Sequence, residues 1–165
     1  MNPETNHFGE GLRTFFRGCA AGVWVITTVD PDGRPVGFTA SSVASVSLDP
    51  AVFTISMQAG SSSWPAVEAT GRLIVHALSA GQQAVARLFS TSGVDRFRGV
   101  NWRPAADGLP LIEGSNGWMS AEILTIVPVG ESRLLLCRAT ETHIPGNRRP
   151  PLVHHDRAYW ATMPA

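Results

Sequence analysis

Residues 37–50 read GFTASSVASVSLDP, and their alternation decides how this part of the chain folds. A strand points successive side chains to opposite faces, so the run predicts a strand with one apolar and one hydroxyl face. No charged residue lies between Val36 and Leu48. We expect the apolar face to meet the core and the hydroxyl face to line a groove. Ser42 breaks the alternation, which favours a bulge or turn near Val43. The hydroxyl face comprises Thr39, Ser41, Ser45 and Ser47, and the apolar face comprises Phe38, Ala40, Ala44, Val46 and Leu48.

The low charge of the chain indicates that part of its surface does not face water. Charged residues make up 16% of the 165 residues, whereas about 25% is typical of globular proteins. Either a homo-oligomer interface or a large ligand groove would account for the difference. The net charge is zero, which argues against nucleic acid as a partner, because such a partner requires a basic patch.

The length suits a single domain over residues 1–165, with residues 1–9 as a flexible N-terminal extension. The N-terminus is polar and interrupted by charge, unlike a signal peptide. No apolar run reaches the roughly 18 residues that a membrane span requires. We therefore expect a cytoplasmic protein with no membrane segment.

The hydrophobic pattern predicts an α+β, mainly β fold, with an antiparallel sheet long enough to curl into a barrel. About seven strands, mostly joined by hairpins, and two to three helices are expected. The segment 91–116 is expected to be irregular because it is rich in Gly and Pro. The expected helices cover 8–22, 64–70 (with Ser63 as N-cap) and 81–90, and the expected strands cover 23–29, 36–47, 51–57, 73–78, 117–127, 132–144 and 157–161.

Sequence motifs for several common chemistries are absent. The chain contains no GxGxxG or GxxxxGK[ST] phosphate-binding loop, no GxSxG nucleophile elbow and no His or Cys pair at zinc-ligand spacing. Its two cysteines, Cys19 and Cys137, are either free buried thiols, which we favour, or a disulfide. The protein is therefore either not an enzyme or an enzyme whose chemistry belongs to a cofactor.

Three stretches could together hold a ligand. The first is the hydroxyl face of 39–47, the second is SSSW at 61–64, and the third is DRFRGVNW at 95–102. Arginines of the third stretch could meet a phosphate and its aromatic residues could stack on a ring. Taken singly, each has an ordinary explanation: a solvated strand face, a helix cap, and solvated arginines. Together they suit a phosphorylated, hydrogen-bonding aromatic molecule.

The order of the motifs resembles the short-chain flavin reductase family. The run GFTASSVASVSLDP is followed by SSSWPAVEATGRLIVHAL (61–78), VARLFS (85–90), DRF (95–97) and GLPLIEG (108–114). The resemblance covers residues 10 to 160. It implies a homodimeric split β-barrel of Greek-key type, of the FMN-binding split-barrel kind, with two to three flanking helices.

The resemblance also implies a function and a set of site residues. Members of the family reduce FAD or FMN with NADH or NADPH, and the family includes the reductase components of two-component flavin monooxygenases. We expect FAD slightly more than FMN. Matching positions imply that the flavin meets Thr39, Ala40, Ser41, Ser42, Ser45, Ser47, Ser61, Ser62, Ser63, Arg96 and Phe97, and that His155 is catalytic, near the nicotinamide.

Two departures from the family pattern concern the nicotinamide. Gly130-Glu131-Ser132 stands where many members have Gly-Asp-His, and His154 and Arg157 replace a usual Tyr and Gly. They leave open the choice between NADH and NADPH. Two alternatives to a reductase therefore stay open: a flavoprotein of the same fold that retains its flavin and acts on a substrate itself, and a non-catalytic flavin-binding protein.

Overall fold

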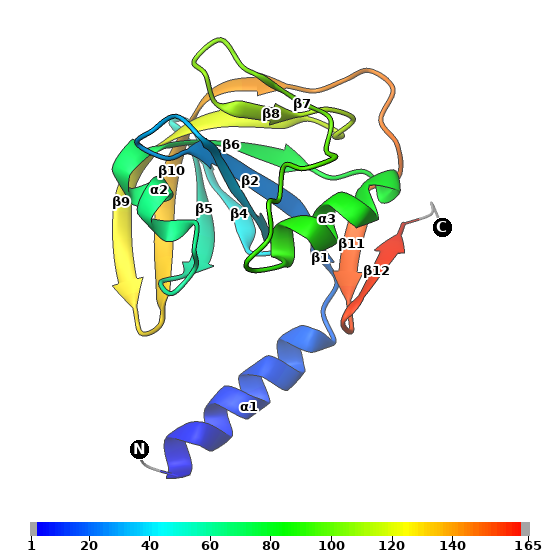
Figure 1. Ribbon diagram of the computed structural model, residues 1–165. Helices are drawn as coiled ribbons and strands as arrows, with labels where there is room; N and C mark the ends of the chain where they lie inside the picture. The colour runs from blue at the N-terminus through cyan, green and yellow to red at the C-terminus, as the bar shows by residue number, and fades with distance from the viewer. Residues whose placement is uncertain (1–2, 163–165) are drawn as a thin grey trace.

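The computed structural model describes residues 3–162 and has a mainly β fold with antiparallel sheets and, in this part of the chain, three α-helices (Figure 1). The helices are α1 (Pro3–Arg17), α2 (Trp64–Thr70) and α3 (Gln83–Ser90), and a 3-10 turn, η1, covers Ala80–Gln82. The strands are β1 (Ala21–Gly22), β2 (Trp24–Val29), β3 (Pro35–Ala40), β4 (Val43–Leu48), β5 (Ala51–Gln58), β6 (Arg72–Ala77), β7 (Trp102–Pro104), β8 (Pro110–Ile112), β9 (Trp118–Val129), β10 (Ser132–His143), β11 (Leu152–His155) and β12 (Ala158–Ala161).

The main sheet has seven strands in the order β3-β2-β6-β9-β10-β5-β4, and every neighbouring pair is antiparallel. Its two outer strands, β3 and β4, are consecutive in the chain and are separated only by Ser41 and Ser42. The Ser56 amide of β5 donates to the Ser42 carbonyl at 3.1 Å. The stretch 35–48 therefore supplies both edges of the sheet and joins them.

Strand β2 is buried on both faces, which explains why its sequence is apolar and β-branched almost throughout. Ile26 packs with Phe38 and Leu135 inside the curved sheet. Val25 packs on the other side, against Phe89 of α3. A strand covered on both faces has no solvent-facing positions, so its sequence lacks alternation.

Gly37 permits helix α3 to approach strand β3 closely. A Cβ atom at this position would lie 2.7 Å from Cε1 of Phe89 and 2.8 Å from the backbone oxygen of Ile26. Both distances are shorter than carbon contacts allow, so the packing of α3 on β3 requires glycine here.

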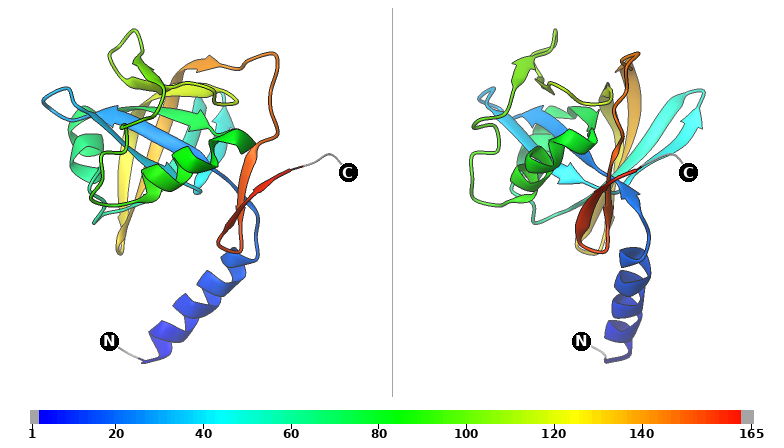
Figure 2. Two further views of the ribbon diagram at one scale, coloured as in Figure 1. Left: turned by 45° about the vertical axis from the view of Figure 1, so that its right-hand side comes forward. Right: turned by 90° about the vertical axis from the view of Figure 1, so that its right-hand side faces the viewer.

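The predicted strand 36–47 differs from the observed one beyond Ala40. A bend at Ser41 and Ser42 divides it into β3 and β4, beside the irregularity expected near Val43, and a register shift follows between Ser45 and Ser47. The expectation that all even residues face the core was wrong, because Val46 is 58% and Leu48 89% exposed. Figure 2 shows β4 and the start of β5 reaching beyond the rest of the sheet, where this chain offers them no core.

Other differences concern short elements. The 91–116 segment contains the hairpin β7–β8, and β11 pairs with both β1 and β12 in a small three-stranded sheet. Helix α1 ends at Arg17 rather than near Gly22, and it is already helical from Pro3, within the expected extension. The strands of the hairpin β7–β8 and of the three-stranded sheet carry too few residues for a periodic signal in the sequence.

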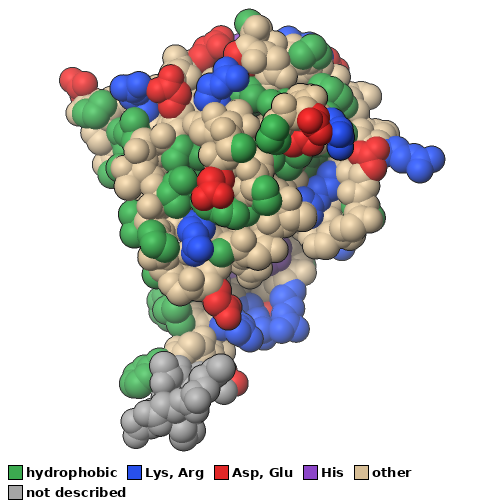
Figure 3. Space-filling view, turned by 60° about the vertical axis from the view of Figure 1, so that its left-hand side comes forward, with side chains coloured by type: hydrophobic (Ala, Val, Ile, Leu, Met, Phe, Trp, Pro, Cys, Tyr) green, Lys and Arg blue, Asp and Glu red, His purple; other side chains and the backbone are tan. Residues whose placement is uncertain are grey.

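Helix α1 projects away from the body of the molecule (Figures 1 and 2). Its apolar residues Phe8, Leu12, Phe15 and Phe16 are 83%, 61%, 69% and 63% exposed. Figure 3 shows hydrophobic side chains both on the body and on this projecting part, with charged side chains between them. The helix thus presents an apolar stripe that the described residues of its own chain leave uncovered.

Cys19 and Cys137 are free thiols, so the favoured alternative is confirmed, although only Cys137 is buried and Cys19 is exposed. Burial raises the pKa of Cys137 to about 12. Within residues 3–162 no group of three or more His, Cys, Asp or Glu side chains is placed to hold a metal ion. No helix in the described part of the chain is both long and apolar enough to cross a membrane.

Candidate functional site

A pocket of about 410 Å³ lies where β3, β5, α3 and the loop before α2 meet. We call it the serine pocket. It brings together seven of the eleven residues predicted to bind flavin: Thr39, Ala40, Ser41, Ser42, Ser61, Ser62 and Arg96. Further lining residues are Phe38, Ser56, Met57, Gln58, Gly60, Phe89, Ser90 and Ser92. Among these described lining residues Arg96 alone is charged, and the rest of the wall is neutral and rich in hydroxyl groups.

The bend between β3 and β4 decides which hydroxyls are available to a ligand. The Thr39 hydroxyl donates to the Ala86 carbonyl at 2.7 Å, so it ties β3 to α3. Ser41 and Ser42 are exposed at the bend. A bend leaves two consecutive side chains free of the strict alternation of a strand, so both can line one cavity. These two serines are therefore the accessible donors of the first motif.

The three serines before α2 divide into two roles. Ser61 and Ser62 line the serine pocket, and the Ser61 hydroxyl accepts the Ser63 amide at 3.3 Å. Ser63 is fully buried and makes no side-chain cap to α2, although it occupies the N-cap position. Its hydroxyl instead donates to the Gly37 carbonyl at 3.2 Å. Ser63 supports the wall from behind.

Arg96 links the third motif to the other two. Its Nε donates to the Thr91 carbonyl at 2.8 Å, and its Nη1 donates to the Gly37 carbonyl at 2.8 Å and to the Ser63 hydroxyl at 3.0 Å. Partial burial lowers the pKa of Arg96. Three ion pairs form among residues 3–162, and none of them involves Arg96. A fixed guanidinium without a carboxylate partner at the pocket wall is suited to an anion.

Two smaller pockets adjoin the serine pocket. The first, of about 210 Å³, shares Ser62 and Arg96 with it and is lined by the loop 93–97; we call it the loop pocket. The second, of about 140 Å³, shares the stretch 39–41 and Ser90 with it; we call it the side pocket. One ligand surface therefore extends in both directions from the serine pocket.

Five predicted residues do not line the serine pocket, and one of them is Ser63, which lines the loop pocket. Phe97 is buried, with its ring centroid 5.0 Å from that of Phe89, and it lines the loop pocket instead. Ser45 and Ser47 lie on β4 and line none of the pockets described. His155 lines none of them either, whereas His154 lines the side pocket.

His154 forms the side pocket together with Tyr159 of β12. The two residues are cross-strand partners whose rings meet edge to face at 5.5 Å. The Arg87 guanidinium lies 5.4 Å from the centroid of the Tyr159 ring. Adjacent strand residues point to opposite faces, which accounts for the difference between His154 and His155.

Sequence reasoning missed the contribution of β5 and of the end of α3. Ser56, Met57 and Gln58 line the pocket at the end of β5, where the Ser56 amide donates to the Ser42 carbonyl of the bend. Ser90 and Ser92 follow the apolar face of α3. Neither group gave a sequence signal for the site: the position of Ser56 and Gln58 depends on a contact with a distant bend, and the serines after α3 look like an ordinary helix end.

The turn that departs from the family motif lies next to this region. Ser132 is the cross-strand partner of Gln58, which lines the serine pocket, and the Ala59 amide donates to the Glu131 carbonyl at 2.8 Å. The position of the missing histidine is thus beside the outer end of β5.

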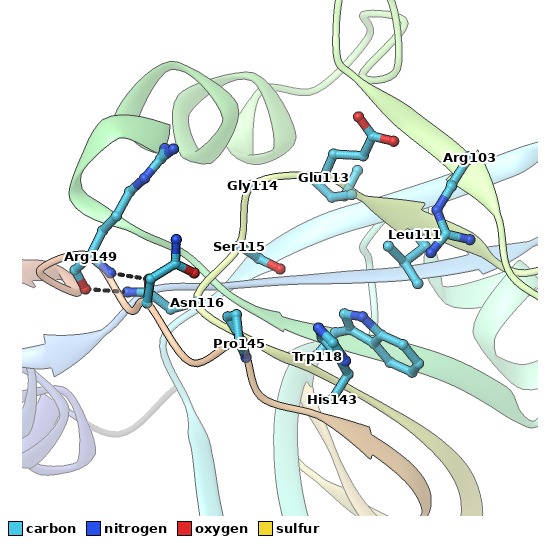
Figure 4. Close-up of a pocket in the computed structure, with 12 residues that line it drawn as sticks. Arg103, Leu111, Glu113, Gly114, Ser115, Asn116, Trp118, His143, Pro145 and Arg149 are labelled. Carbon is cyan, nitrogen blue, oxygen red and sulfur yellow. Dashed lines mark hydrogen bonds between the residues drawn. The ribbon is translucent and has the colours of Figure 1, made fainter.

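A separate pocket of about 320 Å³ lies at the far end of the sheet and shares no lining residue with the serine pocket (Figure 4). Trp118 and His143 stack at its base with centroids 5.7 Å apart. The Asn116 side chain is occupied by two hydrogen bonds to the Arg149 backbone, at 2.8 and 2.9 Å. In Figure 4 the Glu113 and Arg149 side chains point away from the centre. None of the predicted site residues lies here.

His76 is the histidine with the most strongly altered environment, and it is structural. It is fully buried; its Nδ1 donates to the Val25 carbonyl at 3.0 Å, and its Nε2 accepts the Ile112 amide at 3.0 Å. Burial lowers its pKa to about 4, so the ring is neutral at pH 7. It lines none of the pockets described.

A family model and two relatives with similar sequences all concern proteins that reduce flavins. The model of the flavin reductase like domain family matches residues 16–162. The chain is 33% identical over 156 residues to an NADH:FMN oxidoreductase of Rhodococcus qingshengii (92% of this chain, 81% of the relative). It is 34% identical over 145 residues to the reductase subunit HsaB of a flavin-dependent monooxygenase of Mycobacterium tuberculosis (87% and 76%).

The share of a relative that the chain covers differs from one relative to another. A probable flavin reductase of Rhizobium meliloti is 34% identical over 129 residues, which is 78% of this chain but only 42% of that protein. The crystal structure of a flavin reductase domain protein from Arthrobacter sp. FB24 matches with a TM-score of 0.88 at 34% identity, covering 96% of this chain and 98% of the other.

Proposed function

The chain belongs to the flavin reductase-like domain family and is an oxidoreductase of that family, and we propose that it is an NAD(P)H-dependent reductase of FAD or FMN. The observation that carries this proposal is the convergence of seven predicted flavin-binding residues on one neutral pocket beside an unpaired guanidinium. The reaction is a hydride transfer from C4 of the nicotinamide to N5 of the flavin.

The residues of the serine pocket fit a flavin. A volume of about 410 Å³ lies in the range of small-molecule sites. The Ser41, Ser42 and Ser61 hydroxyls can hydrogen-bond the polar edge of the ring and the ribityl chain, and the Arg96 guanidinium can hold a phosphate. The resemblance implies further flavin contacts, and these stay predictions for Ser45, Ser47, Ser63 and Phe97.

The protein's task in this proposal is to position two rings. Hydride transfer between stacked rings requires no side-chain nucleophile, and holding reactants in contact can lower the barrier by about 7–11 kcal/mol. A neutral, hydroxylated wall also holds the flavin without a fixed charge against the ring. Such a wall suits a reductase that releases reduced flavin, which we propose is passed to a partner monooxygenase.

The nicotinamide is proposed to approach from the side pocket. His154 and Tyr159 offer it an aromatic wall, whereas His155 has the catalytic role only through the resemblance. The variants H154A and H155A separate the two assignments. The residue that orients the nicotinamide should, when replaced, raise the apparent KM for NADH more than that for flavin. Equal changes in both KM values for both variants would contradict the assignment of either histidine.

The proposal extends to assembly and architecture. We propose a homodimer, supported by the exposed apolar stripe of α1 and the exposed Val46 and Leu48 of β4. The arrangement of 35–48 along both sheet edges supports a split β-barrel of Greek-key type. A cytoplasmic location is part of the same proposal and rests on the sequence pattern.

The proposed function is tested by NADH oxidation with and without added flavin. We expect purified protein to oxidise NADH only when FAD or FMN is present. Arg96→Ala should weaken FMN binding about tenfold to a hundredfold, because a hydrogen bond to a charged group contributes about 1.5–3 kcal/mol. It should weaken riboflavin binding less, since riboflavin lacks the phosphate. The matched control, Arg98→Ala, changes an exposed arginine outside the pockets described. No oxidation with any flavin, or equal effects of the two variants, would refute the proposal.

A further inference from the structure

The loop pocket continues the serine pocket beyond the residue proposed to hold the flavin phosphate. Ser62 and Arg96 line both pockets, so they form the boundary between them. The loop pocket encloses about 210 Å³, and its remaining walls are Pro35, Val36, Gly37, Ser63, Gly93, Val94, Asp95 and Phe97. FMN ends at its phosphate, whereas FAD continues through a second phosphate to adenosine. A cavity on the far side of the phosphate position is space that FMN leaves unused.

The guanidinium at the boundary retains hydrogen-bonding capacity for phosphate. Arginine has five N–H donors. The three hydrogen bonds of Arg96 engage its Nε and Nη1 groups. These contacts anchor the side chain to Thr91, Gly37 and Ser63 and leave the two N–H groups of Nη2 for a ligand. A guanidinium fixed in this way meets a pyrophosphate with little loss of side-chain freedom.

The walls of the loop pocket combine apolar surface with one acceptor, as recognition of an adenine ring requires. Val94 is 46% exposed at the rim and Phe97 is buried at the floor. One oxygen of the Asp95 carboxylate accepts the Phe97 amide at 3.0 Å, which orients the group. Its other oxygen can accept from the amino group of adenine. A carboxylate in this wall disfavours a further phosphate here and favours a base.

We infer that the loop pocket binds the adenosine half of a flavin dinucleotide, so that the protein prefers FAD to FMN. The inference rests on the proposed function, because it assumes that the serine pocket holds the flavin ring. Arg96 then lies at the pyrophosphate, between the two halves of the ligand. The preference arises in the 93–97 loop and not in the wall that meets the ring.

The inference is tested by the dissociation constants of riboflavin, FMN and FAD, measured by flavin fluorescence. FAD should bind at least tenfold more tightly than FMN. Val94→Trp fills the rim of the loop pocket and should reduce the FAD-to-FMN preference toward one. The matched control Val127→Trp places the same side chain on β9, where Val127 is 42% exposed and lines none of the pockets described, and it should leave the preference at the wild-type value.

A second measurement needs no variant. AMP should compete with FAD for binding but should not displace riboflavin. Equal affinities for FAD and FMN, or the absence of competition by AMP, would overturn the inference and leave the proposed function standing. Failure of all three flavins to bind would overturn both.

Discussion

Acidification should destabilise this protein through His76, which lies on β6 with both ring nitrogens engaged. Its Nε2 accepts the Ile112 amide and its Nδ1 donates to the Val25 carbonyl. Burial disfavours the cation and lowers the pKa of His76 from 6.5 to about 4, although the hydrogen bond to Val25 acts in the opposite direction. A second ring proton would also point at the Ile112 N–H.

The sign and size of the effect follow from this difference in pKa. Above about pH 6.5 His76 is neutral in both the folded and the unfolded state, so the free energy of unfolding does not depend on its titration. Between pH 6.5 and about 4 only the unfolded state takes up the proton, so stability is lost as the pH falls. At about 1.4 kcal/mol per pH unit the full loss is about 3 kcal/mol. About 2 kcal/mol of it falls between pH 7 and pH 5.

The assay is urea unfolding of the wild type and of His76→Gln at pH 7 and pH 5. The glutamine amide does not titrate and can replace one of the two hydrogen bonds. The stability difference between wild type and variant should shrink by about 2 kcal/mol from pH 7 to pH 5. NMR titration of the His76 ring in the folded wild type supplies a check that needs no variant. A ring that titrates near its ordinary value, or parallel losses of stability in both proteins, would refute the reasoning.

Two further predictions concern packing and assembly. Gly37→Ala should lower the free energy of unfolding by about 2 kcal/mol, because its Cβ would lie 2.7 Å from Phe89 and 2.8 Å from the Ile26 oxygen. A Cβ atom at Gly146 would meet nothing within 4 Å, so Gly146→Ala should change the free energy of unfolding far less in the same urea experiment. Equal losses in the two variants would contradict the packing argument. Phe15→Glu places a charge on the stripe of α1, where the side chain is 69% exposed. Light scattering should then report a dimer for the wild type and a monomer for the variant, and a wild-type monomer or a persistent dimer would contradict an interface on α1.

The long elements of this fold could be predicted from periodicity, and the bend that forms the site could be predicted only in part. Strands β2, β5, β6, β9 and β10 carry long apolar or alternating runs, so they stand close to the predicted ranges. The stretch 37–50 also alternates, but its second half extends beyond the core of this chain. Alternation reports which side chains share a face and says nothing of what covers that face.

The candidate site was predictable where neighbouring residues share a bend or loop. Ser41 and Ser42, or Ser61 and Ser62, needed no knowledge of distant contacts to be grouped. Ser56 and Gln58 could not be grouped with them, because their place depends on the contact between the end of β5 and the bend. His154 and His155 show the limit of a resemblance, since neighbours in a strand face opposite ways and a matched position does not tell which one the pocket meets.

The two-residue connection between β3 and β4 has a consequence for motion. Because the chain connects the two outer strands through Ser41 and Ser42 alone, a widening of the gap between these strands would change the backbone dihedrals of these two residues. A ligand that hydrogen-bonds both serines would restrict those dihedrals. It would thereby reduce the opening and closing motion of the sheet. The sheet would then be more rigid when the pocket holds a ligand than when it does not. The connection would have this effect although it contains no hydrophobic core residue.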